Sequence, residues 1–179
     1  MKKIAIPFRA GIKVQLPKGE EKIIFKSDDF EMHKKIRHRG QAIVQSGLDI
    51  EHYVKEIIGR ILFHENDNKE FLAGVLLDTS DCTFSAKRKI LQSTLKHFNL
   101  LEPKEINELE ECLSKVMKYR NAFAHGQIST IKPFTITYFE GREQIKELTE
   151  EYWEKLINYL DKAFELLHGL NDKLIEQGK

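Results

Sequence analysis

Two spacings of apolar residues divide the chain near residue 28. Residues 1–27 alternate apolar with polar positions, and this period of two predicts a short β-rich extension in the form of a hairpin or meander. From residue 28 onward, apolar residues mostly recur every three or four positions, which predicts helices. The first clear stripe of this kind consists of Ile43, Gly47, Ile50, Val54, Ile57 and Ile61.

Capping residues predict where later helices begin. Thr83 or Ser85 can cap one helix, and Pro103 suits the first turn of another, about 103–125. Thr149 can cap a long final helix, because two glutamates follow it and favour a helix N-terminus. The apolar stripe of that last helix is predicted to be Tyr152, Leu156, Tyr159, Ala163, Leu166 and Leu170.

Between the last two helices the alternating pattern returns. Over residues 128–140, the side chains of Phe134, Ile136 and Tyr138 fall on one side, which predicts a hairpin or a strand. The expected fold class is therefore mainly α, an up-and-down helical bundle with a small β appendage made of the N-terminal strands and the 128–140 segment. We expect one compact domain, helical over 28–179.

Composition narrows the class of protein. With 41% apolar and 32% charged residues, a chain of 179 residues is expected to be soluble and to fold around a sizeable core. The net charge of +1 does not favour any class of charged partner, so any contact with nucleic acid must come from a local basic patch. No segment approaches the ~20 apolar residues of a membrane span, and charge and proline interrupt the N-terminus too soon for a signal peptide. Cys82 and Cys112 lack metal-type spacing, and two reduced thiols fit a cytoplasmic protein. The sequence predicts no cofactor and no metal site.

Arg120 lies on the apolar stripe of the 103–125 helix, where a leucine would continue the core. An unpaired buried guanidinium is costly, so Arg120 needs an acidic partner or an anionic ligand, unless it reaches water at the helix end. Glu51 faces the apolar side of its own helix, because seven and eleven residues bring a helix back to nearly the same direction. Glu51 is therefore a candidate partner for Arg120. The alternative is a glutamate at the edge of its stripe, in contact with water.

His125 and Asn121 are four residues apart and share a helix face that points away from the stripe. We expect both to be exposed, or to lie in an interface between two chains. His125 by itself also fits a surface histidine favoured by the helix C-terminus. Five helical positions turn by about 140°, so Arg120 and His125 of one chain point in different directions. A twofold axis can bring an Arg120 and a His125 from different chains to one phosphate.

Further basic residues surround this helix end. Lys115 and Lys118 add positive charge near Arg120 and are predicted to contact RNA. His33 and His38, in "MHKKIRHRG", have no metal-ligand companions at matching spacing. They belong either to a solvated basic face or to a surface that guides an RNA backbone.

The stretch "YRNAFAHG", residues 119–126, resembles the Arg-x-x-x-x-His signature of the HEPN superfamily. Upstream, "RGQAIVQSGLDIEHYVKEII" and "FSAKRKILQSTL" resemble the branch that contains mannitol-repressor-like and defence-associated proteins, so that the likeness covers about residues 36–127. Many HEPN proteins are metal-independent ribonucleases that act as dimers in toxin–antitoxin or phage-defence systems, whereas others only bind nucleotides, RNA or proteins. The resemblance implies catalytic roles for Arg120, Asn121 and His125.

The leading hypothesis is a homodimeric, metal-independent endoribonuclease, with an antitoxin protein as a further partner. In it the 2′-hydroxyl of RNA attacks the phosphate, His125 acts as acid–base group, and Arg120 binds the phosphoryl oxygens. Asn121 binds the phosphate or orients the imidazole, and Glu51 holds the guanidinium. The alternative is a non-catalytic HEPN protein that binds RNA, a nucleotide or a partner protein, as a regulator of the mannitol-repressor-like kind.

Overall fold

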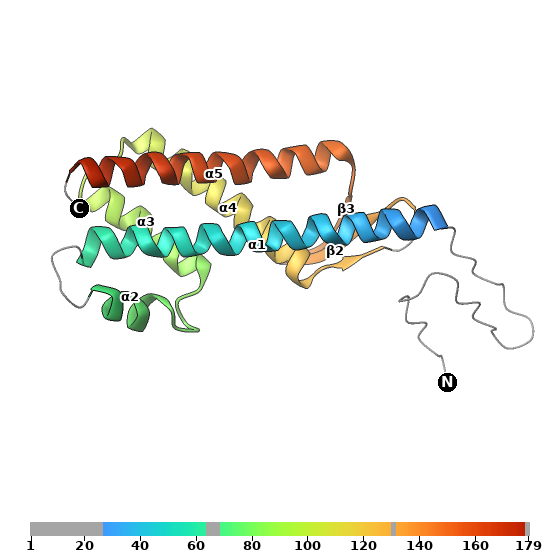
Figure 1. Ribbon diagram of the computed structural model, residues 1–179, viewed down its shortest axis with the longest axis horizontal. Coiled ribbons are helices and arrows are strands. Elements are labelled where there is room, and N and C mark those ends of the chain that lie inside the picture. The colour runs from blue at the N-terminus through green and yellow to red at the C-terminus, as the bar shows by residue number, and fades with distance from the viewer. Residues whose placement is uncertain (1–26, 64–68, 130–131, 178–179) are drawn as a thin grey trace, which may run out of the picture.

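The computed structural model describes residues 27–63, 69–129 and 132–177. Its helices and strands follow one another along the chain as shown in Figure 1. They are α1 (Ser27–Phe63), α2 (Lys69–Leu77), α3 (Phe84–His97), α4 (Pro103–His125), β1 (Gln127–Ile128), β2 (Thr135–Glu140), β3 (Arg142–Glu147) and α5 (Glu150–Glu176). The predicted β-rich extension, residues 1–27, lies outside the described residues except for Ser27, which begins α1.

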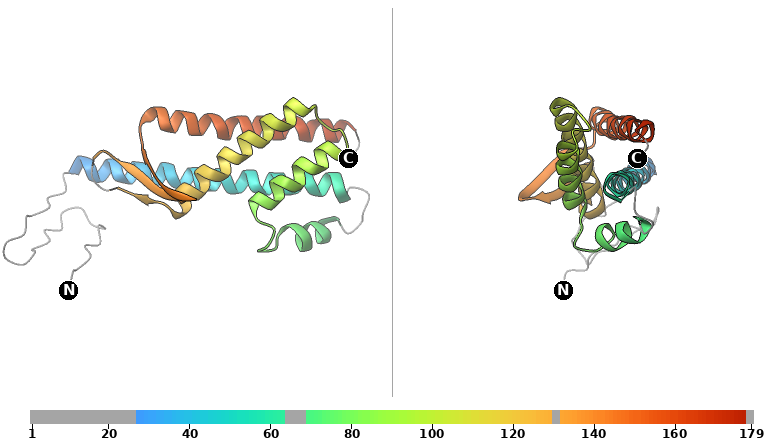
Figure 2. Two further views of the ribbon diagram at one scale, coloured as in Figure 1. Left: turned by 180° about the vertical axis from the view of Figure 1, so that it is seen from behind. Right: turned by 90° about the vertical axis from the view of Figure 1, so that its left-hand side faces the viewer.

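Three long helices form the body of the molecule. α1 and α5 run in the same direction, and α4 returns in the opposite direction and crosses them obliquely (Figures 1 and 2). α4 packs against both, and α1 also contacts α2 and α3. α2 lies on the side of α1 that faces away from α5 (Figures 1 and 2). The prediction of a mainly helical bundle with a small β appendage is confirmed.

The core follows the stripes predicted for α1 and α4. In α4, Ile106, Leu109, Leu113 and Val116 are at most 3% exposed. The buried apolar residues of α1 are Ile36, Ile43, Ile50, Val54, Ile57, Ile58 and Ile61. The stripe of α4 therefore runs through the core up to the turn that carries Arg120.

The stripe predicted for α5 was partly wrong. Leu156, Ala163 and Leu170 are buried as expected, but Tyr152 and Tyr159 are only half-buried. The remaining buried residues of this helix are Trp153, Leu160, Leu167 and Leu174. Most residues of the predicted stripe are followed directly by another apolar residue, so the sequence pattern fits either register. The structure buries Trp153, Leu160 and Leu167, and it leaves Tyr152, Tyr159 and Leu166 of the predicted stripe half-buried at the rim of the core.

Predicted caps are present. The Thr83 hydroxyl accepts a hydrogen bond from the backbone N–H of Ala86, and the Thr149 hydroxyl accepts one from Tyr152. Pro103 is the first residue of α4, which begins with a capping box. Each cap satisfies a backbone donor that a helix N-terminus leaves without an intrahelical partner.

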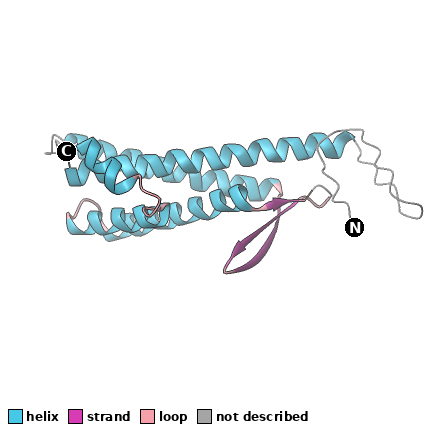
Figure 3. Cartoon of the chain, turned by 90° about the horizontal axis from the view of Figure 1, so that it is seen from below, coloured by secondary structure: helices cyan, strands magenta, loops and turns pink. Residues whose placement is uncertain are grey.

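The β appendage is an antiparallel sheet in the order β1-β2-β3. Ile136 and Tyr138 of β2 are buried and form a small cluster with Ala122 of α4. The tip of the hairpin turns at Gly141, whose φ of 69° suits glycine. Figure 3 shows the β2–β3 hairpin projecting from the helices. The alternating pattern over 128–140 was therefore correctly interpreted, and β3 extends the hairpin beyond it.

Candidate functional site

Arg120 lies at the seam between α4 and α1. A Cβ atom at Gly47 of α1 would be 2.9 Å from the Cβ atom of Arg120 and 3.0 Å from its Cγ atom. Only glycine leaves room there for the aliphatic stem of the arginine. One heptad earlier, a Cβ atom at Gly40 would be 2.8 Å from the ring of Phe123. Two glycines of α1 thus admit two consecutive stripe residues of α4.

The predicted ion pair between Glu51 and Arg120 is present. Nη1 of Arg120 lies 3.1 Å from Oε2 of Glu51. The side chain of Glu51 is 15% exposed and that of Arg120 is 24% exposed, so the pair is largely removed from water. The carboxylate of Glu51 therefore offsets the cost of placing the guanidinium of Arg120 on the apolar stripe. The exposed part of the guanidinium remains accessible to a ligand.

Sequence reasoning missed the second cation on Glu51. Nζ of Lys87, in α3, donates to Oε1 of Glu51 at 2.8 Å, and its side chain is only 10% exposed. A signal was available, because Lys87 lies between Phe84 and Leu91 on the buried face of α3. The same reasoning that singled out Arg120 applies to it. Glu51 thus links three helices through one carboxylate.

A second buried cation lies next to Lys87 in the sequence. Arg88 pairs with Glu110 of α4 through its Nη2 atom, and its Nη1 atom lies 3.4 Å from the sulfur of Met117. Glu51, Lys87 and Arg120 form a charged cluster between α1, α3 and α4, separate from the Arg88–Glu110 pair. The cluster has two cations and one carboxylate, so it retains one positive charge, which favours an anion close to Arg120.

His125 and Asn121 are exposed, as predicted. His125 is the last residue of α4, and the N–H of Gly126 donates to the carbonyl oxygen of Ala122 at 2.7 Å. A Cβ atom at Gly126 would clash with that oxygen, so glycine is required where the chain turns toward β1. The turn leaves the imidazole of His125 at the end of the helix.

Within one chain, Arg120 and Asn121 face different sides of α4. Arg120 contacts α1, whereas Asn121 lines a hollow of about 240 Å³ between α4 and β2. Lys115 and Lys118 line the same hollow. His125 lies about 140° from Arg120 around the helix, and therefore on the side of Asn121.

The two lysines predicted to contact RNA differ in their environment. Nζ of Lys118 lies 2.6 Å from Oε2 of Glu140 in β2, and this hydrogen bond raises the pKa of Lys118 above its usual value. Lys118 is thus charged but already paired with a carboxylate. Lys115 is half-buried on the same side of α4.

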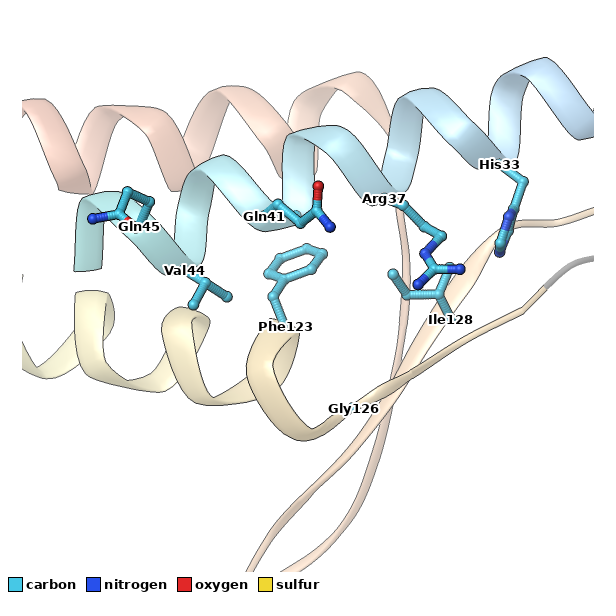
Figure 4. A pocket seen from close by; sticks show the side chains of 9 residues that line it. His33, Arg37, Gln41, Val44, Gln45, Phe123, Gly126 and Ile128 are labelled. Carbon is cyan, nitrogen blue, oxygen red and sulfur yellow. The ribbon is translucent and has the colours of Figure 1, made fainter. Parts of the chain in front are cut away.

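A larger cavity lies on the other side of the helix end. It measures about 470 Å³ and is bounded by α1, the last turn of α4 and β1 (Figure 4). His33 and Arg37 line it, whereas His38 is exposed elsewhere on α1. Burial, and secondarily the charge of Arg37, lowers the pKa of His33. His33 and His38 therefore do not line the cavity together. The cavity itself was not predicted from the sequence.

Neither a metal centre nor a membrane helix is found in the described part of the chain. No group of three or more His, Cys, Asp or Glu residues lies together there in a way that would hold a metal ion. None of its helices is both long and apolar enough to span a bilayer.

No protein-family model matches the chain, and comparisons with curated proteins and with solved structures give no match either. The resemblance to the HEPN superfamily therefore stays a prediction that depends on the residues of the motif and on their placement.

Proposed function

We propose that the protein is an endoribonuclease of the HEPN type, acting as a homodimer in the cytoplasm. A role in toxin–antitoxin or phage defence follows from the resemblance alone. The observation that supports the proposal is the arrangement at the end of α4. A guanidinium is held by Glu51 at the helix seam, and an exposed imidazole and amide, His125 and Asn121, stand on the same last turns.

Two copies make this arrangement useful for catalysis. Arg120 and His125 diverge within one chain, so a single copy presents either group to a phosphate but not both. In a twofold dimer the exposed face of one α4 can meet the seam of the other. Each phosphate would then contact the arginine of one copy and the histidine of its partner.

The reaction uses the nucleophile that RNA itself carries. His125 removes the proton of the 2′-hydroxyl, whose oxygen attacks the neighbouring phosphorus while the bond to the 5′-oxygen breaks. A water molecule protonates the departing 5′-oxygen, and the proton that His125 has taken up then restores the water. Arg120 matches the charge on the phosphoryl oxygens with its planar fork, and Asn121 donates a hydrogen bond to the same group.

A second candidate is a non-catalytic protein that binds RNA, a nucleotide or a partner protein. The charges near the motif are compatible with it. Glu51 holds Arg120 and Glu140 holds Lys118, and two cations held in place can bind a ligand whether or not that ligand is cleaved. In this case the same face would hold a ligand without cleaving it.

Cleavage of mixed RNA in the presence of EDTA tests the proposal. The protein should cut RNA, and His125→Ala should lose at least the ~100-fold expected for removal of an acid–base group. Arg120→Lys should also be inactive, because an ammonium cannot reproduce the planar fork. His97→Ala, which changes an exposed histidine of α3, is the matched control and should keep full activity.

Light scattering on the same samples tests the dimer. An active monomer at tens of micromolar would contradict the two-copy site. A folded dimer that cuts no RNA under any condition would instead establish the binding protein as the better account.

A further inference from the structure

The cavity between α1 and α4 has a polar wall of regular spacing. Four residues of α1 at intervals of four, His33, Arg37, Gln41 and Gln45, line it (Figure 4). Residues four apart share a helix face, so these side chains form a stripe about 18 Å long. Figure 4 shows the side chains of Arg37 and His33 extending toward Ile128 at one end of the stripe, and Gln45 lying at the opposite end.

The chemistry changes along this stripe. Arg37 supplies a cationic fork that suits a phosphate, and His33 beside it has a lowered pKa, so its neutral ring can donate or accept a hydrogen bond. Gln41 and Gln45 supply planar amides, which suit the edges of bases. The amide nitrogen of Gln45 donates one of its two protons to Asp49 at 2.8 Å, so one N–H and the carbonyl oxygen remain for a ligand.

The other walls fit the same kind of ligand. None of the described residues that line the cavity is acidic, so none of these side chains repels a phosphate. The ring of Phe123 forms an apolar wall and is itself fixed by stacking on Trp153, with ring centroids 5.1 Å apart. A cavity of about 470 Å³ is large enough for a nucleotide-sized group.

We propose that this stripe of α1, His33, Arg37, Gln41 and Gln45, binds a short single strand of RNA. The phosphates lie at Arg37 and the bases lie against the two glutamines. A single strand is favoured because a duplex turns its base edges inward, where glutamines cannot reach them.

The stripe leads to the candidate site. Phe123 meets Gly40 of α1, and Arg120 meets Gly47 seven residues further along, which is about 10 Å of helix. A strand held in the cavity is therefore directed along the seam toward Arg120. Its identity as the substrate rests on the proposed function, but its binding requires no cleavage.

Fluorescence anisotropy with a labelled single-stranded oligoadenylate tests the inference. Adenine is chosen because a glutamine amide can pair with it through two hydrogen bonds. All proteins carry His125→Ala, so that the RNA is not consumed under the proposed mechanism. Three variants are compared, Arg37→Gln, Gln41→Glu and the control Arg60→Gln, and each lowers the net charge by one unit. Arg60 is an exposed arginine near the other end of α1.

Arg37→Gln should weaken binding at least about tenfold, because a charge-assisted hydrogen bond is lost. It should also reduce the slope of log affinity against log salt by about 0.7, the value for one phosphate contact with a single strand. Gln41→Glu should weaken binding comparably, since the new carboxylate repels phosphates and can pair with Arg37. Arg60→Gln should change affinity by less than about twofold.

Equal losses in all three variants would overturn the inference, because they would reflect net charge alone. The inference would also be overturned if duplex RNA bound as tightly as the single strand. It would be overturned likewise if the protein bound AMP but did not bind the oligonucleotide. Circular dichroism confirms that each variant is folded. Cleavage by the protein with His125 intact is a separate readout. Binding that depends on Arg37 in a protein that cuts no RNA would refute the enzyme and leave this inference standing.

Discussion

Removing the carboxylate of Glu51 is the perturbation that tests the charged cluster most severely. Glu51→Ala leaves two cations, Lys87 and Arg120, without their shared partner in a region where the three side chains are 10–24% exposed. Breaking a fully buried ion pair by removing one partner costs about 3–5 kcal/mol. Because the cluster is not completely buried, we expect a loss of about 3 kcal/mol. For a chain of this size the midpoint of thermal unfolding should fall by about 6–12 °C.

Urea denaturation measures the loss, and two double-mutant cycles divide it between the partners. One cycle combines Glu51→Ala with Arg120→Ala and the other combines it with Lys87→Ala. Each should give a coupling free energy of about 1 kcal/mol or more, because the two residues of each pair are in contact. The control is the exposed pair of Glu108 and Lys162, whose charged atoms lie 3.5 Å apart and which should couple by less than about 1 kcal/mol.

Replacement of all three residues adds an independent check. If Glu51, Lys87 and Arg120 are all changed to leucine, most of the lost stability should return, since buried ion pairs are often no more stabilising than apolar groups of similar volume. Additive cycles, or a loss with Glu51→Ala no larger than about 1 kcal/mol, would show that Arg120 is satisfied by water and would refute the cluster as its anchor.

Three further predictions concern single positions. Gly47→Ala forces a Cβ atom against the side chain of Arg120 and should lower the free energy of unfolding in urea by about 1–3 kcal/mol. Gly169→Ala is the control, because a Cβ atom there meets nothing within 4 Å, and it should stabilise α5 by up to about 1 kcal/mol. Lys118→Gln should weaken RNA binding in anisotropy less than Lys115→Gln, because the ammonium of Lys118 must first leave its carboxylate; equal losses would show that the ion pair does not restrain it. Because the pKa of His33 is lowered in the folded state, the unfolded chain binds more protons below the ordinary value of 6.5, and the free energy of unfolding should decline as the pH falls from above 6.5 through the depressed pKa. Denaturation at several pH values measures this decline, and His33→Gln should make it shallower. The same pH dependence in the variant and the wild type would contradict the prediction.

Much of the candidate site was predictable because charges stood where apolar residues were expected. Arg120 on the stripe of α4 and Glu51 on the apolar side of α1 pointed to each other, and the structure joins them at 3.1 Å. Lys87 gave the same signal on α3 but was not used. Periodicity shows which residues of a helix face the core, but it does not show which residues of another helix they meet there.

Other features depend on packing that a one-dimensional pattern does not contain. The register of α5 was open, because Tyr152 and Trp153 are adjacent and either fits a stripe. The cavity lined by His33 and Arg37 exists only because α4 ends at Gly126 and the chain turns away toward β1. Its regular spacing of four is visible in the sequence, but the space in front of it is not.

The central claim is that the motif cleaves RNA through the substrate's own 2′-hydroxyl, and the chemical ends of the products test it most directly. RNA is incubated with the protein in EDTA, and the fragments are identified by mass spectrometry beside a His125→Ala reaction. We predict fragments that end in a 2′,3′-cyclic phosphate and begin with a 5′-hydroxyl, which are formed by the wild-type protein and are at least about 100-fold fewer with the variant. Fragments with 5′-phosphates, or cleavage that appears only when magnesium is added, would contradict the account.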